Sequence, residues 1–383
     1  MMVSKIALLQ AILNSYEIPG NVEDEAIVEN TIVYKVIRQP EKGNTSLSKY
    51  AGEIARQLGA ESITITKLPE VNAYGIVAPY RYTSPVDIAG LLDSPEFSGS
   101  ESNLAFAVGK DAFGGNVIGD LVKMPHLLVG GSTDFGKSVF LDSLIISLLS
   151  KSSPVDVNLV LISPGSNSFS QYCGVPHLAH PLITATGDAA RFLDSLSDLI
   201  QQRFASFDVL SRFLHDVIKK NKNLRSHYNG GVIRNIDDYN TIGNDDDRAR
   251  MPRVVVIVDE LADLMSTARD QVEKAVSKLG IKARAAGIHL VLATSRIDPE
   301  IITDTIKTYC PSRIAFKTPD TDGSRIILDR SGAEELLGGG DMLYQQTGAL
   351  FPKRVQGAYI SGETIARAVK DAIESHANVP KPK

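Results

Sequence analysis

Residues 126–140 constrain this chain more than any other segment. They read His-Leu-Leu-Val-Gly-Gly-Ser-Thr-Asp-Phe-Gly-Lys-Ser-Val-Phe and contain the pattern G-x-x-x-x-G-K-[ST]. In this pattern glycines let backbone N–H groups curl around phosphates, and the lysine reaches the terminal ones. An apolar run at 127–129 precedes it as a candidate buried strand, and 139–149 follow as a candidate helix whose N-terminal dipole faces the anion. The segment predicts a nucleoside triphosphate site made of Gly131, Ser132, Thr133, Asp134, Phe135, Gly136, Lys137 and Ser138.

Composition excludes several other classes of protein. The 383 residues are 43% hydrophobic and 22% charged, which is ordinary for globular material and enough for two or three domains. Two cysteines are too few for a disulfide framework and lack metal-ligand spacing. No stretch approaches the roughly 18 apolar residues of a membrane span, and residues 1–20 predict an amphipathic helix rather than a signal peptide. The net charge of −5 argues against a uniformly basic nucleic-acid coat but permits a local basic channel.

The first part of the chain, residues 1–105, predicts a separate small α/β domain. Strand candidates lie at 31–37, 62–66 and 74–77, and residues 46–58 have helical spacing. Pro79, Pro85 and Pro95 mark turns and a boundary. Residues 106–370 are expected to form the second domain, and residues 371–383 a C-terminal tail.

In the second domain, apolar strand-like runs alternate with amphipathic helical runs, which is typical of a parallel sheet covered on both faces. The expected strands are 126–129, 157–162, 254–258, 288–293 and 313–316. The expected helices lie near 139–150, 187–207, 270–286 and 299–309. The polar segment 219–250 is expected to be a solvated surface excursion.

Two carboxylates, Asp259 and Glu260, stand directly after the apolar strand 254–258. In P-loop enzymes an acidic residue at this strand end helps to hold Mg²⁺, and a following glutamate can orient the attacking water. Taken alone, such a pair more often caps the next helix, but after a P-loop the magnesium interpretation is favoured. We therefore expect Lys137 on the β- and γ-phosphates, Ser138 and Asp259 on Mg²⁺, and Glu260 aligning or activating water.

Several blocks of the sequence resemble the FtsK/SpoIIIE family of DNA translocases, ring-shaped motors that pump double-stranded DNA by ATP hydrolysis. The blocks are LLDSPEF at 91–97, MPHLLV at 124–129, VDELADLM at 258–265, KARAAGIHLVLAT at 282–294, SGAE at 331–334 and GDML at 340–343. The resemblance runs from about residue 30 to residue 370. It implies an α/β fold in which a small N-terminal α domain precedes a RecA-like P-loop NTPase core with a parallel-rich sheet, assembled as a homohexamer around DNA. It also implies a motor core alone, without the membrane-spanning region and winged-helix γ domain of full-length members.

The resemblance implies three further site residues. Arg284 matches the family's arginine finger, which contacts a neighbour's nucleotide, and Arg296 and Lys307 match basic positions that face DNA in the pore. Phosphate contacts of this kind bind without reading sequence and weaken steeply with salt. Six copies of a few basic residues would line a channel even though each subunit is net acidic.

The P-loop departs from the family's pattern at two positions. Asp134 and Phe135 replace the inner Gly-Ser of the family's Gly-Thr-Thr-Gly-Ser-Gly-Lys-Ser. A carboxylate about 4 Å from a phosphate charge costs on the order of 4 kcal/mol at an effective dielectric of about 20, before Mg²⁺ and water offset part of it. The departure predicts weakened nucleotide affinity.

Three further departures lie outside the P-loop. Residues 163–165, Ser-Pro-Gly, replace the family's Asp-Pro-Lys, and Ser295 replaces a glutamine suited to sensing the γ-phosphate. A pore-loop lysine is replaced near Thr321, where Asp320 and Asp322 add negative charge beside the expected DNA path. The blocks that specify the fold are thus intact while several functional ones have drifted.

Three functional hypotheses follow, of which the first is favoured. The chain is a DNA-stimulated ATPase that translocates double-stranded DNA as a ring, in chromosome or plasmid segregation or transfer. Alternatively, it is a nucleotide- and DNA-binding ring component with weak or absent ATPase activity, or a ring ATPase of the secretion or conjugation type. We expect ATP and Mg²⁺ as cofactors, a cytoplasmic location without a direct membrane span, and a separate partner for any membrane anchoring or directionality.

Overall fold

The computed structural model describes most of the chain. The described residues are 5–16, 18–28, 31–37, 47–58, 63–67, 73–79, 85–111, 114–124, 126–225, 228–243 and 250–377. They form two compact units, one comprising Met1–Pro85 with Lys110–Gly115 and the other Val86–Gly109 with Asn116–Lys383. Residues 86–105, expected in the first domain, thus belong to the second compact unit. The division into domains 1–105, 106–370 and 371–383 stays a prediction.

The first unit contains a four-stranded antiparallel sheet with the order β1-β2-β4-β3. Its described elements are α1 (Lys5–Ser15), β1 (Asn21–Val28), β2 (Thr31–Ile37), η1 (Leu47–Tyr50), α2 (Ala51–Leu58), β3 (Thr64–Lys67) and β4 (Ala73–Pro79). Leu9 and Ile12 of α1 pack with Ile54 of α2 and with Tyr34 and Ile76 of the sheet. The predicted N-terminal helix and the strands near β2, β3 and β4 are confirmed, whereas β1 was not predicted.

Five parallel strands form one end of the sheet in the second unit. They are β8 (Leu127–Gly130), β9 (Val157–Ile162), β10 (Arg253–Val258), β11 (Ile288–Thr294) and β12 (Ser312–Phe316), and their order is β9-β10-β11-β8-β12. Nearly every residue of these strands is buried, as expected for strands covered on both faces. All five predicted strands are confirmed to within a residue or two. Their carboxyl ends meet at one edge of the sheet, which is where ligands bind in such folds.

Further strands extend this sheet beyond β12 in the order β7-β6-β14-β13-β12. They are β6 (Ala105–Asp111), β7 (Asn116–Asp120), β13 (Asp341–Gln345) and β14 (Lys353–Tyr359), and the short β5 (Val86–Asp87) pairs with β14. The strand β13 runs antiparallel to β12, so its first residues lie at the same edge as the carboxyl end of β12. The residues just before β13 therefore come close to the P-loop.

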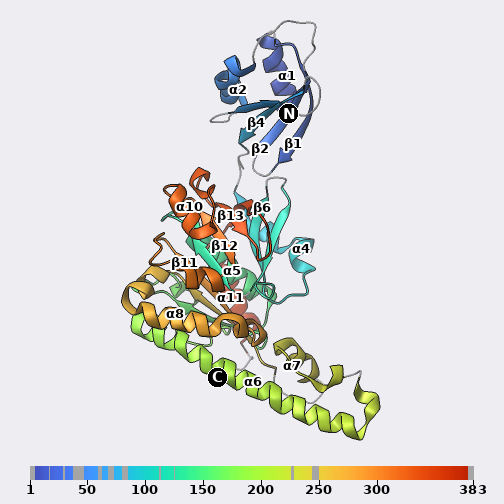
Figure 1. Cartoon of the computed structure of the whole chain (residues 1–383), viewed down its shortest axis with the longest axis vertical. Helices are drawn as coiled ribbons and strands as arrows, with labels where there is room; N and C mark the ends of the chain where they lie inside the picture. The colour runs from blue at the N-terminus through green and yellow to red at the C-terminus, as the bar shows by residue number, and fades with distance from the viewer. Residues whose placement is uncertain are drawn as a thin grey trace. The chain divides into compact units, whose positions relative to one another are not determined.

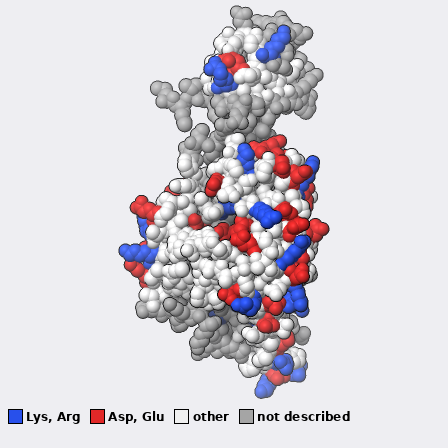
Figure 2. Space-filling view, turned by 90° about the vertical axis from the view of Figure 1, so that its left-hand side faces the viewer, with Lys and Arg blue, Asp and Glu red and all other residues white. Residues whose placement is uncertain are grey.

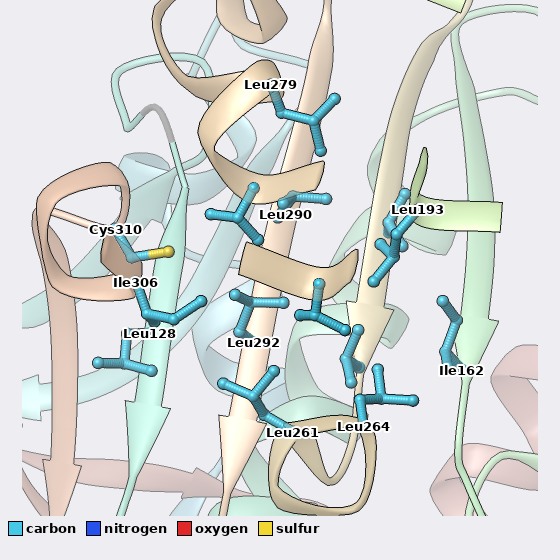
Figure 3. Close-up of a cluster of buried hydrophobic side chains, with 14 of the residues drawn as sticks. Leu128, Ile162, Leu193, Leu261, Leu264, Leu279, Leu290, Leu292, Ile306 and Cys310 are labelled. Atoms are coloured by element: carbon cyan, nitrogen blue, oxygen red, sulfur yellow. The ribbon is translucent and has the colours of Figure 1, made fainter. Parts of the chain in front are cut away.

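The second unit contains helices that cover the sheet and others that lie away from it. They are α3 (Ile88–Leu92), α4 (Pro95–Ser98), α5 (Lys137–Lys151), α6 (Thr186–Lys220), α7 (Ile236–Gly243), α8 (Leu261–Ala285), α9 (Asp304–Tyr309), α10 (Thr321–Leu328) and α11 (Gly362–Ser375), with η2 (Ser170–Tyr172), η3 (Lys222–Arg225), η4 (Asn229–Gly231) and η6 (Ala333–Glu335). The long helices α6 and α8 lie side by side (Figure 1). Between them and the sheet lies the largest described core, where Leu128, Leu290 and Leu292 meet Leu193 of α6 and Leu264 of α8 (Figure 3).

The segment expected to be a solvated excursion contains structure of its own. The distal half of α6 packs with the following residues in a small second core formed by Phe207, Leu210, Leu214, Ile233, Ile236 and Ile242. The expectation for 219–250 therefore holds for the exposed residues 219–223 and was wrong around Ile233, Ile236 and Ile242, because these few apolar side chains are enough to fold the segment back onto α6. Residues 244–249, with the three consecutive aspartates, lie outside the described part.

Helix α11 continues to Ser375, so the expected tail at 371–383 begins inside a helix, and residues 378–383 lie outside the described part. Among the described residues, no helix combines the length and the apolar composition needed to cross a bilayer.

Candidate nucleotide site

The predicted phosphate loop links the carboxyl end of β8 to the first turn of α5. Gly131 and Gly136 have φ values of +149° and +121°, a region that favours glycine. A Cβ on Gly131 would lie 2.6 Å from Cβ of Phe316, so the loop passes too close to β12 for any side chain there. The helix starts at Lys137 without a side-chain cap. Its first N–H groups are therefore available to an anion.

Lys137 is almost buried at the start of α5, with 8% of its surface exposed. Its Nζ donates a hydrogen bond of 2.7 Å to the carbonyl oxygen of Ser132. Burial lowers the pKa of the ammonium group, and the negative charges of Glu260, Asp259 and Asp134 partly oppose that shift. The lysine thus lies inside the curve of the loop, among the carboxylates with which sequence analysis grouped it.

The two substituted P-loop residues adopt defined positions. Asp134 has φ +65°, the left-handed region that a glycine would occupy more easily and that aspartate tolerates better than most residues. Its side chain is exposed, while Phe135 is partly buried and its carbonyl oxygen accepts a 3.2 Å hydrogen bond from the N–H of Gly340. The eight predicted residues, Gly131 to Ser138, therefore form one loop together with the first two residues of α5.

Glu260 lies at the end of β10 and is held by the end of the neighbouring strand β11. Its Oε1 accepts a 2.6 Å hydrogen bond from Thr294 Oγ1, and its Oε2 accepts one of 3.0 Å from the N–H of Ser295. The Ser295 hydroxyl donates to the same carboxylate. Glu260 also accepts from the N–H of Ala262 and so caps α8. The capping and site interpretations of this residue are compatible.

Ser138 and Asp259 fit the chemistry of a magnesium site. Among the residues that the structure describes, neither the Ser138 hydroxyl nor the Asp259 carboxylate makes a side-chain hydrogen bond or ion pair. Both are hard oxygen donors, the type that Mg²⁺ prefers. Asp259 is fixed through its backbone, because its N–H donates to the carbonyl oxygen of Ile162 at 3.0 Å. These two side chains could therefore hold the ion beside the phosphates.

A further carboxylate, Asp142, was not predicted. It lies on α5 four residues after Ser138, hence on the same face of the helix. Its Oδ1 accepts hydrogen bonds from Tyr172 Oη at 2.7 Å and from Gln171 Nε2 at 3.2 Å. Burial raises the pKa of Asp142 to about 6, and the charge of Asp259 adds to the shift. The helical spacing from Ser138 was the signal that could have identified it.

Arg284 does not approach the P-loop within one chain. It belongs to the last turn of α8, just before β11 begins, whereas the P-loop follows the carboxyl end of β8. The two therefore lie at opposite edges of the parallel sheet. The Arg284 side chain is exposed, and its Nε donates a 2.9 Å hydrogen bond to the carbonyl oxygen of Val122.

The two residues predicted to contact DNA, Arg296 and Lys307, lie at opposite edges of the parallel sheet. Arg296 follows the carboxyl end of β11, and its side chain is 60% exposed, 3.9 Å from a carboxylate oxygen of Asp298. Lys307 lies in the last turn of α9, before the start of β12, and its ammonium forms an ion pair with Asp329. That aspartate also pairs with Arg313. The structure thus leaves Arg296 accessible and pairs Lys307 with an aspartate of the same chain.

The residues that depart from the family's pattern outside the P-loop have defined hydrogen bonds or backbone angles. Asp320 is the N-cap of α10, because its carboxylate accepts a 2.8 Å hydrogen bond from the N–H of Gly323. Gly165 has φ +65°, and the N–H of Ser163 donates a hydrogen bond to the carbonyl oxygen of Ile183.

On the face of the second unit drawn in Figure 2, the described basic side chains are interspersed with acidic ones and form no continuous basic stripe. This face differs from the uniformly basic surface typical of a nucleic-acid-binding monomer.

Most of this chain is similar in sequence to known proteins. A model of the FtsK/SpoIIIE family matches residues 87–299. The chain is 38% identical over 372 residues to the DNA translocase FtsK of Clostridium acetobutylicum, covering 96% of this chain and 46% of the relative. It is 40% identical over 327 residues to DNA translocase FtsK of Mycobacterium tuberculosis, covering 82% and 37%. The chain thus spans less than half the length of these relatives.

Solved structures support the fold. The pCW3 conjugation coupling protein TcpA, in a monomer form with ATPγS, matches 96% of this chain and 99% of its own, with a TM-score of 0.64 and 21% identity. The cytoplasmic domain of the Thermomonospora curvata type VII secretion ATPase EccC matches 79% of this chain and 35% of its own, with a TM-score of 0.60 and 23% identity. The α/β fold with a mixed, parallel-rich sheet is thereby confirmed.

Proposed function

This chain belongs to the FtsK/SpoIIIE family, and we propose that it is an ATPase that translocates double-stranded DNA as a ring, in chromosome or plasmid segregation or transfer. The observation that carries the proposal is the convergence of Lys137, Asp259 and Glu260 at the carboxyl ends of parallel strands. Curated relatives at 38–40% identity bear the name DNA translocase FtsK, which supports the same conclusion.

Each residue of the site has a role in phosphoryl transfer. The N–H groups of the loop 131–138 and the Lys137 ammonium bind the phosphates of ATP and stabilise the charge that develops in the transition state. Ser138 and Asp259 would hold Mg²⁺, which neutralises phosphate charge when bound. Glu260, oriented by Thr294 and Ser295, aligns the attacking water and accepts its proton.

Arg284 acts on the site of a neighbouring subunit. Its place at the opposite edge of the sheet from the P-loop prevents it from serving its own nucleotide, and its exposed guanidinium fits a contact between subunits. A head-to-tail contact between the two edges repeats around a closed ring. We therefore propose a homohexamer in which each Arg284 stabilises charge on the next subunit's γ-phosphate.

Arg296 and Lys307 are proposed to contact DNA phosphates in the ring. The exposed guanidinium of Arg296 supports its role directly. Lys307 would have to exchange its ion pair with Asp329 for a phosphate, so we expect its contribution to be the smaller of the two. Action on DNA implies a cytoplasmic location, and a separate partner would supply any membrane attachment or directionality.

The test is steady-state ATP hydrolysis with and without long double-stranded DNA. Lys137→Ala serves as the control, with circular dichroism to establish that both proteins are folded. We expect turnover that DNA stimulates strongly and that the substitution abolishes. Turnover indifferent to DNA would favour a motor of the secretion or conjugation type, and turnover equal to that of Lys137→Ala would refute an ATPase.

A second function, a ring component that binds nucleotide but hydrolyses it weakly, has one specific observation in its favour. Asp134 places a carboxylate in the phosphate loop at φ +65°, where a glycine would bring neither charge nor backbone strain. Tight binding of DNA together with turnover at the level of Lys137→Ala would support this second function.

A further inference from the structure

A glycine turn just before β13 touches the outer side of the phosphate loop. Gly338, Gly339 and Gly340 have φ values of +82°, +60° and +91°, so all three adopt the left-handed conformation. Gln356 Nε2 of β14 donates a 2.8 Å hydrogen bond to the carbonyl oxygen of Gly339. The buried Asp341, which follows the turn, pairs with Arg354. The turn is thereby attached firmly to the hairpin of β13 and β14.

Phe135 of the phosphate loop lies directly against this turn. A Cβ on Gly338 would come within 2.6 Å of Cδ1 and 3.0 Å of Cε1 of the Phe135 ring. The N–H of Gly340 donates a 3.2 Å hydrogen bond to the Phe135 carbonyl oxygen. A Cβ on Gly136 would lie 2.9 Å from the Cα of Gly340. The loop and the turn approach each other closely enough to require glycine on both sides.

The end of β12 holds the loop from its other side. The Ser132 N–H donates a 2.9 Å hydrogen bond to the carbonyl oxygen of Lys317. The ammonium of Lys317 lies 6.0 Å from the centre of the Phe135 ring, at the outer limit of a cation–π contact. Two backbone hydrogen bonds and one aromatic ring therefore attach the phosphate loop to the elements beside it.

We propose that Phe135 is a positioning residue, which docks on the turn Gly338–Gly340 and fixes the curve of the phosphate loop before nucleotide binds. The proposal rests on the proposed function, because it assumes that the phosphate loop binds nucleotide. Asp134 makes the curved loop harder to maintain, since it adds a charge and a side chain at a left-handed position. Because the contact between Phe135 and the turn holds the loop in shape, the loop loses less conformational entropy when nucleotide binds.

The test compares alanine at two neighbouring glycines, with Mg·ADP as the probe. Gly338 and Gly339 both have positive φ, but a Cβ on Gly338 would strike Phe135 whereas one on Gly339 meets nothing within 4 Å. We expect Gly338→Ala to weaken Mg·ADP binding by about tenfold or more, as for other small misplacements of binding groups. Gly339→Ala, which carries the same type of backbone strain, should change the affinity much less. Equal weakening by both substitutions would overturn the proposal.

A double-mutant cycle with Phe135→Ser checks that the contact itself is responsible. Phe135→Ser alone should weaken Mg·ADP binding, Phe135→Leu should retain most of it, and adding Gly338→Ala to Phe135→Ser should cost little more. If the two losses of Mg·ADP affinity were additive, the two residues would act independently, which would contradict the proposed contact. If Gly338→Ala alone fails to fold, recovery of folding by Phe135→Ser supports the contact, and failure to recover contradicts it.

Two further readouts separate the possible failures. Affinities are measured well below the unfolding temperature of each variant, so a purely structural role would lower that temperature and leave the affinity unchanged, which contradicts positioning. If the wild-type protein binds no Mg·ADP, the proposed function fails and the inference fails with it. If the wild type binds and the cycle is additive, only the inference fails.

Discussion

The hydroxyl of Ser295 donates a hydrogen bond to the carboxylate of Glu260, so the end of β11 orients a side chain at the end of β10. Thr294 donates to the same carboxylate at 2.6 Å. In the sheet, β11 lies between β10 and β8, the strand that leads into the P-loop. The serine that replaces the family's glutamine thus has a definite structural role, because it fixes the acidic group beside the phosphate loop.

Ser295→Ala should lower the turnover of ATP about tenfold and leave its KM little changed, because the substitution removes a hydrogen bond that orients Glu260 but no contact to the phosphates. Steady-state kinetics over a range of ATP concentrations measures both quantities. Ser277→Ala, on the exposed side of α8, is the matched control and should be silent. A rise in KM alone would indicate that Ser295 contacts nucleotide instead.

Asp134→Asn should tighten Mg·ATP binding roughly three- to tenfold, since it removes a carboxylate near the phosphates, although solvent around this exposed group screens the repulsion. Asparagine also tolerates the left-handed conformation, so the backbone should stay in place. Calorimetric titration at low and high salt measures the change. The gain should shrink as salt rises, and a gain independent of salt would point to the backbone rather than the charge.

Arg284→Ala should reduce ATP turnover by roughly a thousandfold in the assembled protein, as loss of an arginine finger does in related phosphoryl-transfer enzymes. Lys282→Ala, exposed on the same turn of α8, is the matched control. Mixing inactive Lys137→Ala and Arg284→Ala proteins should restore part of the activity, because some subunit contacts then combine an intact lysine with an intact arginine. No recovery in mixtures that demonstrably assemble would exclude action between subunits.

Arg296→Ala should weaken binding to double-stranded DNA and reduce the salt dependence of the affinity by about 0.9 in log–log slope for each DNA phosphate that the variant no longer neutralises. Lys307→Ala should chiefly lower the unfolding temperature, because its ammonium pairs with Asp329 inside the subunit. Fluorescence anisotropy at several salt concentrations and thermal unfolding separate the two effects. An equal decrease in salt dependence in both variants would mean that Lys307 leaves Asp329 when DNA binds.

Stability should fall as the pH drops from 6.5 towards 5. Burial lowers the pKa of His126 to about 4 and of His289 to about 3, and it also lowers the pKa of His177. The unfolded chain therefore takes up protons below pH 6.5 that the folded protein does not, which destabilises the fold by up to about 1.4 kcal/mol per pH unit for each histidine. Well above pH 6.5 the three histidines are neutral in both states and this loss disappears.

Asp142 opposes that trend. Because its folded pKa is raised to about 6, the folded protein takes up a proton below pH 6 that the unfolded chain accepts only near pH 4. Asp142→Asn should therefore steepen the loss of stability between pH 6 and 5, as measured by urea unfolding at each pH. A shallower slope in Asp142→Asn would contradict the assignment.

The sequence predicted the parallel strands well because they are buried on both faces. A strand such as β10, Arg253–Val258, is almost entirely Val and Ile, and its period cannot be confused with that of a surface helix. β14 was not predicted, since it begins with Lys353 and Arg354, Gln356 interrupts its apolar residues, and the residues at both of its ends are exposed. Helix α8 begins at Leu261, where the side chain of Glu260 caps it, and it has non-helical backbone angles at Ala268, so the helix predicted near 270–286 matches the part of α8 after this kink.

The candidate site likewise contains residues that the sequence could identify and contacts that it could not. The P-loop residues were predictable because they are contiguous, and Asp259 with Glu260 because they follow a strand. The contact of Asp142 with Tyr172 joins segments 30 residues apart and depends on how the loop after β9 folds. Only tertiary structure could reveal that contact, or the pairing of Lys307 with Asp329.

The packing of helix α6 affects how the molecule unfolds locally. Its first half packs into the main core through Leu193 and Ile200, while its second half packs through Leu210 and Leu214 into a small cluster of its own. Local stability follows the amount of apolar surface buried, so the two halves should not lose their hydrogen bonds together. In native-state hydrogen exchange this single helix should be read as two cooperative segments, and the amides near Leu214 should exchange long before those near Leu193.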